Sequence, residues 1–261
     1  MGGFSTVAFA KRQTSGTTSR GSSPQVGAAG RYSTHHGPAY SVAVTRFIEL
    51  SHQIVPGMTT YPGLPVPKVD LVFDYDASRA HYSDQAEFLI ANLHLCGNTG
   101  TYVDSPRHRY RDGIDLAGLP LERLAHLPAV VVDATQAGRS IDAEHFQDLD
   151  VAGRAVLVRT DFSDHWGTDA YFSNNPFLTG DACALLAAQG AAFVGIDSLN
   201  IDDTGDLSRP AHTKLLLAGI PICEHMTALK DVPGGARIHA VPIAWVGGVT
   251  FPVRAYAVVD V

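Results

Sequence analysis

The chain has 261 residues, of which 45% are apolar and 17% are charged, and its formal net charge is −7. A chain of this length can bury enough apolar surface to fold without disulfides or a structural metal. Its acidic balance argues against nucleic acid or an anionic membrane as a partner. Cys96, Cys183 and Cys223 form an odd set without CxxC spacing, which argues against a zinc ribbon or a disulfide framework and fits a reducing cytoplasm. No apolar run approaches the roughly 20 residues that a membrane span requires.

The first 46 residues differ in composition from the rest of the chain. Residues 1–48 contain no Asp or Glu, whereas Arg, Ser, Thr and Gly are frequent. This composition predicts an N-terminal arm, residues 1–46, without a core of its own. A flexible or partner-packed arm, an upstream translation start and an organelle transit peptide are the three interpretations that it allows. Residues 47–261 are predicted to form a single domain.

A globular pattern begins at residue 47. Residues 47–54 and 69–73 are predicted as short strands, separated by a Pro- and Gly-rich turn that cannot be helical. Residues 89–95 are predicted as a third strand. The apolar runs AVVVD (129–133) and AVLVRTD (155–161) are typical of strands that are buried on both faces of a sheet.

Strands and helices alternate in the second half of the chain. The segment LTGDACALLAAQG predicts a helix that Thr179 or Asp181 can cap, and a buried strand follows over 191–197. The same order recurs as a helix over 211–218 and a strand over 220–223. The sequence therefore predicts an α/β fold, a mixed sheet with helices packed on it.

Residues 97–110, GNTGTYVDSPRHRY, are too poor in apolar side chains to be core. They carry residues that bind metals or move protons: Asn98, Tyr102, Asp104 and His108. We expect them in a loop held by Pro106. Alone, this spacing is more typical of a structural turn in which Asp104 accepts backbone N–H groups and His108 lies on the surface.

Two further polar residues stand at ends of predicted elements. His212 opens the helix over 211–218, and Glu224 ends the apolar strand GIPICE. Both positions lie at the mouth of an α/β sheet, where ligands bind. Since an unpaired buried charge is costly, Glu224 needs a cation or a proton. A salt bridge to Arg209 or Lys214 is the purely structural alternative.

Several segments together resemble a known family. They are LSHQIVPGMTTYPGLPVP, GNTGTYVDSPRHRYRDG, FVGIDSLNIDD, AHTKLLLAGIPICEHMTAL and the final PVRAYAVV. Their order is similar to that of the cyclase superfamily that includes bacterial kynurenine formamidase and isatin hydrolase. The resemblance covers residues 47–260, and it implies a swivelling β/β/α fold and metal-dependent hydrolysis of an amide, formamide, lactam or lactone.

The resemblance also assigns roles to individual residues. The family motif HxGTHxDxPxH falls on Asn98, Gly100, Thr101, Tyr102, Asp104, Pro106 and His108, so Asn98 and Tyr102 stand where the family has histidines. It implies that Asp104, His212 and Glu224 are metal ligands. It further implies that His108 is the general acid/base and that Tyr61 lines the substrate pocket.

The two substitutions change what metal chemistry is expected. An amide and a neutral phenol are poor replacements for imidazole at a zinc or manganese centre. We therefore expect at most one divalent metal, Zn or Mn, on Asp104, His212 and Glu224. Without a metal, the same carboxylates would form an acid/base cluster with the two histidines and Tyr102.

The sequence thus predicts a hydrolase of C–N bonds, similar to kynurenine formamidase, that acts on a small molecule. His108, Tyr102 and Asp104 are the predicted catalytic residues, and Tyr61 and Asn98 the predicted substrate-binding residues. A metal-free cyclase or dehydratase and a catalytically inactive binding protein are the alternatives. We expect a cytoplasmic homodimer or homotetramer, the assembly being implied by the resemblance.

Overall fold

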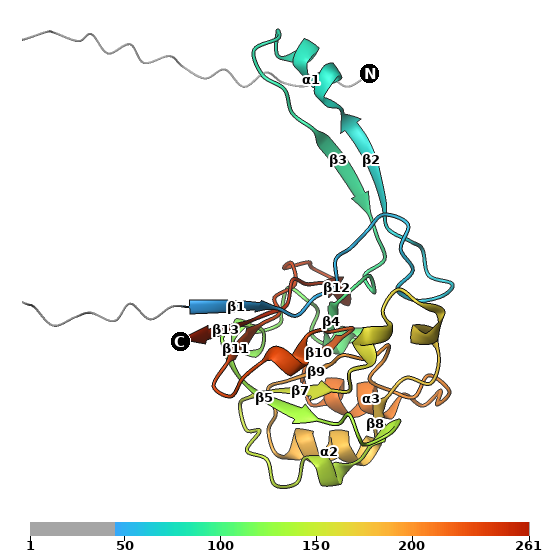
Figure 1. The fold of residues 1–261 in the computed structure, drawn as a ribbon, viewed down its shortest axis with the longest axis vertical. Helices are drawn as coiled ribbons and strands as arrows, with labels where there is room; N and C mark the ends of the chain where they lie inside the picture. Colours follow the sequence, from blue (N-terminus) through green and yellow to red (C-terminus); the bar gives the residue numbers. More distant parts are fainter. Residues whose placement is uncertain (1–44, 261) are drawn as a thin grey trace, which may run out of the picture. The chain divides into compact units, whose positions relative to one another are not determined.

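The structure is a computed structural model, and it describes residues 45–260. Most of the predicted N-terminal arm, residues 1–44, lies outside the described residues. Thr45 and Arg46 belong to the first strand, β1 (Thr45–Glu49), which pairs antiparallel with the last strand, β13 (Tyr256–Asp260). The two ends of the described chain therefore lie side by side in one sheet (Figure 1).

The main sheet has nine strands in the order β1-β13-β11-β5-β7-β9-β10-β4-β12. Besides β1 and β13, they are β11 (Arg237–His239), β5 (Leu127–Asp133), β7 (Ala155–Arg159), β9 (Phe193–Ile196), β10 (Ile222–Glu224), β4 (Tyr102–Asp104) and β12 (Thr250–Pro252). The four central strands β5, β7, β9 and β10 are parallel, and the strands on either side pair antiparallel. The prediction of a mixed sheet is confirmed.

Two helices connect the parallel strands. Helix α2 (Gly180–Ala188) lies between β7 and β9 in the chain, and α3 (Pro210–Leu217) lies between β9 and β10. Of the two predicted caps, Thr179 is the one used, because its side chain accepts the N–H of Ala182. Figure 1 shows both helices on the same side of the parallel strands.

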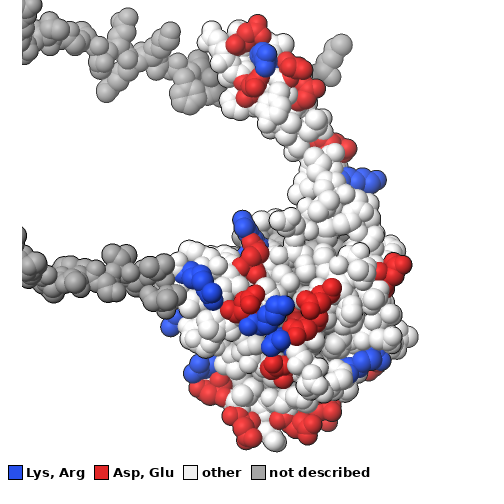
Figure 2. Space-filling view, in the orientation of Figure 1, with Lys and Arg blue, Asp and Glu red and all other residues white. Residues whose placement is uncertain are grey.

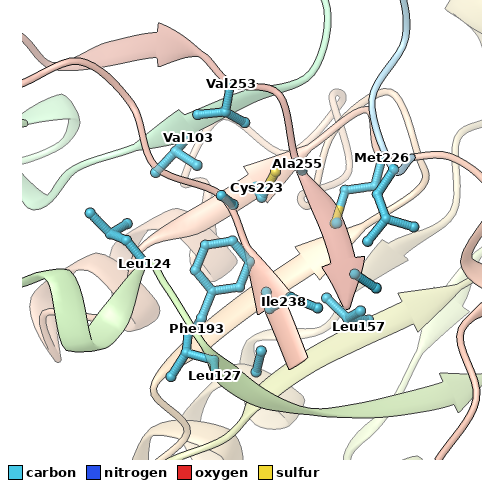
Figure 3. Packing of buried hydrophobic residues seen from close by; sticks show 14 of the residues in the cluster. Val103, Leu124, Leu127, Leu157, Phe193, Cys223, Met226, Ile238, Val253 and Ala255 are labelled. Carbon is cyan, nitrogen blue, oxygen red and sulfur yellow. The ribbon is translucent and has the colours of Figure 1, made fainter. Parts of the chain in front are cut away.

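Strands β7, β9 and β10 are buried on both faces, as predicted for β7, whereas β5 is largely half-buried. Along β7, Ala155 and Leu157 face one apolar cluster, whereas Val156 and Val158 face the cluster that contains α2 and α3. Figure 3 shows the first cluster, where Leu157 packs near Phe193 and Met226. Because both faces are apolar, polar side chains are displaced to the ends of the strands, and this positions the candidate site.

A second, smaller sheet is a hairpin of β2 (Lys68–Phe73) and β3 (Ile90–His94), with α1 (Tyr75–His81) between them in the chain. Every residue of β2 and β3 is exposed. The exposed residues include large apolar side chains: Val69, Leu71, Val72, Phe73, Ile90 and Leu93. A third sheet pairs β6 (Ser140–Ile141) with β8 (Phe177–Leu178).

One predicted strand is shorter than expected. The strand predicted over residues 47–54 ends at Glu49. The Ser51 hydroxyl donates to the carbonyl of Val253 and accepts the N–H of Ala255, so a side chain takes over backbone pairing there. Within residues 45–260, no helix is long and apolar enough to cross a membrane. Figure 2 shows acidic and basic side chains interspersed on the visible face.

Candidate active site

Strand β4 carries two polar side chains on one face of the sheet. Tyr102 and Asp104 are two residues apart, so their side chains point the same way. Tyr102 lies opposite Glu224 of β10, and Asp104 lies opposite Thr250 of β12. The Tyr102 hydroxyl donates to Glu224 Oε2 at 2.5 Å, and the Thr250 hydroxyl donates to Asp104 Oδ1 at 2.6 Å. The strand register therefore fixes both pairs.

The predicted loop over residues 97–110 is only partly a loop. Its middle is strand β4, and Pro106–His108 is a single 3₁₀ turn. At Gly97, a β-carbon would come within 2.5 Å of the backbone oxygen of Thr250. Only glycine permits this close approach, which lets β12 pair beside β4. The turn after Asp104 then brings His108 back toward Thr250.

Asp104, Thr250 and His108 form a hydrogen-bonded chain. His108 Nδ1 lies 3.0 Å from Thr250 Oγ1. Because the hydroxyl proton is directed to Asp104, Nδ1 is the donor in the second bond, and the lone pair of His108 lies on Nε2. The His108 side chain is 32% exposed, whereas that of Asp104 is fully buried. The arrangement orients an exposed imidazole with a basic nitrogen available to a ligand.

His212 is held by a second carboxylate. Its Nδ1 lies 2.6 Å from Asp202 Oδ2, and the Asp202 carboxylate also accepts the N–H groups of Ala211 and His212. His212 Nε2 then faces Asp104 Oδ2 at 3.6 Å and Glu224 Oε1 at 3.8 Å. Both distances are too long for hydrogen bonds. Asp104 Oδ2 is buried and has no hydrogen-bond partner within residues 45–260.

Burial and neighbouring charges perturb each of these groups. Burial favours neutral His212, but the carboxylates of Asp104 and Asp202 outweigh it and raise the pKa to about 10. Burial raises the pKa of Glu224 to about 7, against the opposing effect of His212. Burial and the nearby Glu224 raise the pKa of Tyr102 well above its usual value. Burial would raise the pKa of Asp104, yet His108 and His212 keep it low. The ionised form of Asp104 and the protonated form of His212 are therefore favoured, whereas Glu224 and Tyr102 are biased toward their neutral forms.

A cavity of about 340 Å³ opens over this cluster. Its lining residues are Tyr61, Leu64, Asn98, Tyr102, His108, Arg109, Asn200, Arg209, His212 and Glu224. The Tyr61 hydroxyl donates to the carbonyl of Leu199 and accepts a bond from the Asn200 amide at 2.6 Å. The structure thus brings the predicted residues Tyr61, Asn98, Tyr102, His108, His212 and Glu224 together around one cavity, with Asp104 buried beneath it.

Several site residues escaped the sequence reasoning. Thr250, Asp202 and Asn200 each orient another site residue, and none of the three was assigned a role from the sequence. Asn200 and Asp202 lie in the segment FVGIDSLNIDD that contributed to the family resemblance, but no role was assigned to them there. The alternative partners of Glu224 are wrong, because in the described chain neither Arg209 nor Lys214 forms an ion pair with it.

The cluster offers ligand atoms for a metal ion. His212 Nε2 is 3.6 and 3.8 Å from two carboxylate oxygens, and two atoms bound to one zinc ion at about 2.0–2.2 Å lie at most about 4.4 Å apart. A cation would also stabilise Asp104 Oδ2, which is buried without a hydrogen-bond partner in the described chain. The group in the described chain whose ligand atoms all lie within 4.8 Å of one another is Asp104, His108 and His212, and Glu224 is not part of it.

Comparison with known proteins identifies the family. The Cyclase family model matches residues 48–203. The chain belongs to the cyclase family. A kynurenine formamidase of Salinibacter ruber is 32% identical over 213 residues, which cover 80% of this chain and 95% of the relative. A kynurenine formamidase of Bacillus mycoides is 26% identical and covers 81% of this chain and 96% of its own length.

Solved structures share the fold of this chain. An isatin hydrolase bound to the product analogue thioisatinate matches with a TM-score of 0.70 at 23% identity, over 83% of this chain and 93% of that one. A protein described as a potential metal-dependent hydrolase with cyclase activity matches with a TM-score of 0.68 at 27% identity, over 82% and 98%. These matches confirm the predicted α/β fold and the predicted family. The relatives also confirm the prediction of an enzyme of the hydrolase class.

Proposed function

We propose that this cyclase-family protein hydrolyses the C–N bond of an aryl formamide or a related small amide, with lactams and lactones as the neighbouring substrate classes. The observation that carries the proposal is the hydrogen-bonded chain from Asp104 through Thr250 to His108, which ends at a cavity of small-molecule size. The relatives named kynurenine formamidase support the formamide assignment.

His108 is the proposed proton shuttle. Its Nε2 takes a proton from a water molecule, and the water oxygen attacks the formyl carbon of the substrate. The proton then passes from His108 to the leaving nitrogen, and the C–N bond breaks to give an aryl amine and formic acid, which releases the second proton of the water to solvent as it ionises to formate. Thr250 is a positioning residue, because it fixes which nitrogen of His108 is basic. Buried Asp104 stabilises the imidazolium that forms between the two steps.

Asp104, His212 and Glu224 would hold a single Zn or Mn ion. Among the groups that border His212, we assign Glu224 as the third ligand, because it is buried whereas His108 is exposed and engaged by Thr250. Such an ion would polarise the substrate carbonyl and neutralise negative charge that develops on its oxygen. Asp202 orients His212 toward that position, as a carboxylate commonly does for a metal-binding histidine.

A second candidate function is a metal-free cyclisation or dehydration. The pair of Tyr102 and Glu224 favours it, because the 2.5 Å hydrogen bond joins two groups whose pKa values burial raises. Such a pair can donate and accept a proton without a metal. Tyr102→Phe distinguishes the two: turnover falls sharply in the metal-free scheme and little in the single-metal scheme.

A substrate panel tests the proposal. Formanilide represents aryl formamides, isatin represents lactams and dihydrocoumarin represents lactones. Each is incubated with the full chain that has been loaded with Zn or Mn, and with protein treated with a chelator. Release of aniline from formanilide that exceeds the rate without protein supports the proposal. No turnover of any of the three, with or without metal, would overturn it in favour of an inactive binding protein.

A further inference from the structure

We propose that Arg109 and Arg209 form a subsite for a carboxylate of the substrate, so that the preferred substrate is an aryl formamide that carries an acidic group. This inference rests on the proposed function for the reaction itself. The subsite stands on separate observations, because both arginines line the same cavity as His108 and neither takes part in the proposed proton transfer.

Arg209 is held with its guanidinium toward the cavity. Its backbone is left-handed, with φ of 50°, a conformation that ordinary side chains rarely adopt. Such backbone strain is often found at functional sites. Within residues 45–260 the guanidinium makes one hydrogen bond, at 3.1 Å to Asn200 Oδ1, and no ion pair within 4.0 Å. A guanidinium has five N–H donors, so Arg209 retains donors that can bind a ligand in the cavity that it lines.

Arg109 is fixed to the same segment of chain. Its Nε donates to Thr213 Oγ1 at 3.2 Å and its Nη2 to the carbonyl of Ser208 at 3.3 Å. Thr213 in turn donates to the carbonyl of Arg209 at 2.7 Å. All of these partners are uncharged. These bonds orient the Arg109 side chain but do not neutralise its positive charge. In the described chain it too lacks a carboxylate partner within 4.0 Å.

The surrounding charges leave room for a ligand anion. An acidic neighbour of Arg209 on its own loop is Asp206, whose carboxylate already accepts the N–H and hydroxyl of Ser208. Asp104 and Glu224 lie deeper and are bound by Thr250 and Tyr102. Guanidinium groups bind carboxylates in a planar, two-point geometry, which adds specificity to the charge attraction. A benzoate-type carboxylate beside the formamide matches both the chemistry and the small cavity.

A pair of substrates that differ by one carboxylate tests the subsite. N-formylanthranilate carries the acid, and formanilide lacks it. The variants are Arg209→Gln and Arg109→Gln, and the matched control is Arg111→Gln, which removes the same charge from an exposed neighbour outside this cavity. For each protein, kcat/KM is measured for both substrates, and the melting temperature is recorded.

The wild-type enzyme should prefer N-formylanthranilate, and each subsite variant should reduce that preference by about tenfold or more, mainly through KM. The control should keep the wild-type preference. Equal losses for both substrates, or a fall in melting temperature that accounts for the lost activity, would mean that the arginines are structural and would overturn the subsite. An unchanged preference in both variants would overturn it as well.

Binding separates the subsite from the reaction. If wild type hydrolyses neither substrate, the proposed function fails, and calorimetry with anthranilate and aniline then decides the subsite. Anthranilate binding that is lost in Arg209→Gln while aniline binds weakly everywhere would support it. Anthranilate binding that is absent, or equal in wild type and both variants, would reject it.

Discussion

Replacing Thr250 by Val removes one hydroxyl and little volume. The hydroxyl donates to Asp104 Oδ1 at 2.6 Å and lies 3.0 Å from His108 Nδ1. A hydrogen bond to a charged group contributes about 1.5–3 kcal/mol, and a buried acceptor that is left unsatisfied costs about 1–3 kcal/mol. Without the hydroxyl, His108 is no longer held in position for proton transfer. If most of this free energy is lost from the stabilisation of the transition state, Thr250→Val should lower kcat by about 10- to 100-fold. It should also lower the melting temperature, because the Asp104 carboxylate is fully buried.

Steady-state hydrolysis of formanilide by wild type, Thr250→Val and Thr250→Ser measures the effect. Serine keeps the hydroxyl and loses the methyl group, so it should recover most of kcat. The comparison separates orientation from packing. A wild-type kcat in Thr250→Val, or the same loss in both variants, would refute the role of the hydroxyl in orienting His108.

Three further expectations concern the metal, the pH dependence and the assembly. Elemental analysis should find at most one divalent ion per chain, lost in Glu224→Gln and kept in His108→Asn, and two tightly held ions would contradict the site. In chelator-treated protein, protonated His212 stabilises the fold fully below about pH 6.5, and this contribution is lost as the pH rises through about 10. The melting temperature should therefore fall over that range, and more steeply than in His212→Gln. We also propose that a second copy covers the apolar hairpin of β2 and β3, because an isolated two-stranded sheet is marginally stable. Light scattering should give the mass of two or four chains, with dissociation in Leu93→Lys, and a monomeric wild type would contradict this.

The central strands and the family could be predicted because their signals are local. The apolar runs over 129–133 and 155–161 correspond to β5 and β7, and the helix capped by Thr179 is α2. Continuous apolar character is imposed by burial on both faces, and the sequence displays it directly. His212 and Glu224 were predicted at element ends, and the structure places both there.

The orientation of His108 could not be predicted in the same way. Thr250 lies 146 residues from Asp104 in the chain, and the two meet only because β4 and β12 pair in one register. A three-residue strand such as β4 has no hydrophobic period that could reveal it. The Asp202 contact with His212 arises from capping of α3, which local spacing did not distinguish from a solvated acidic loop. The exposed hairpin follows normal strand patterning, so nothing in the sequence separated it from the core.

The catalytic role of His108 is the central claim, and one measurement tests it most directly. His108→Asn is compared with wild type for kcat on formanilide, with metal content and melting temperature as controls. General acid/base groups contribute about 10²–10⁴-fold in rate, so kcat should fall by that factor. Metal content should stay unchanged, because the proposed ligands are Asp104, His212 and Glu224, whereas His108 is engaged by Thr250. Wild-type turnover by His108→Asn would contradict the mechanism.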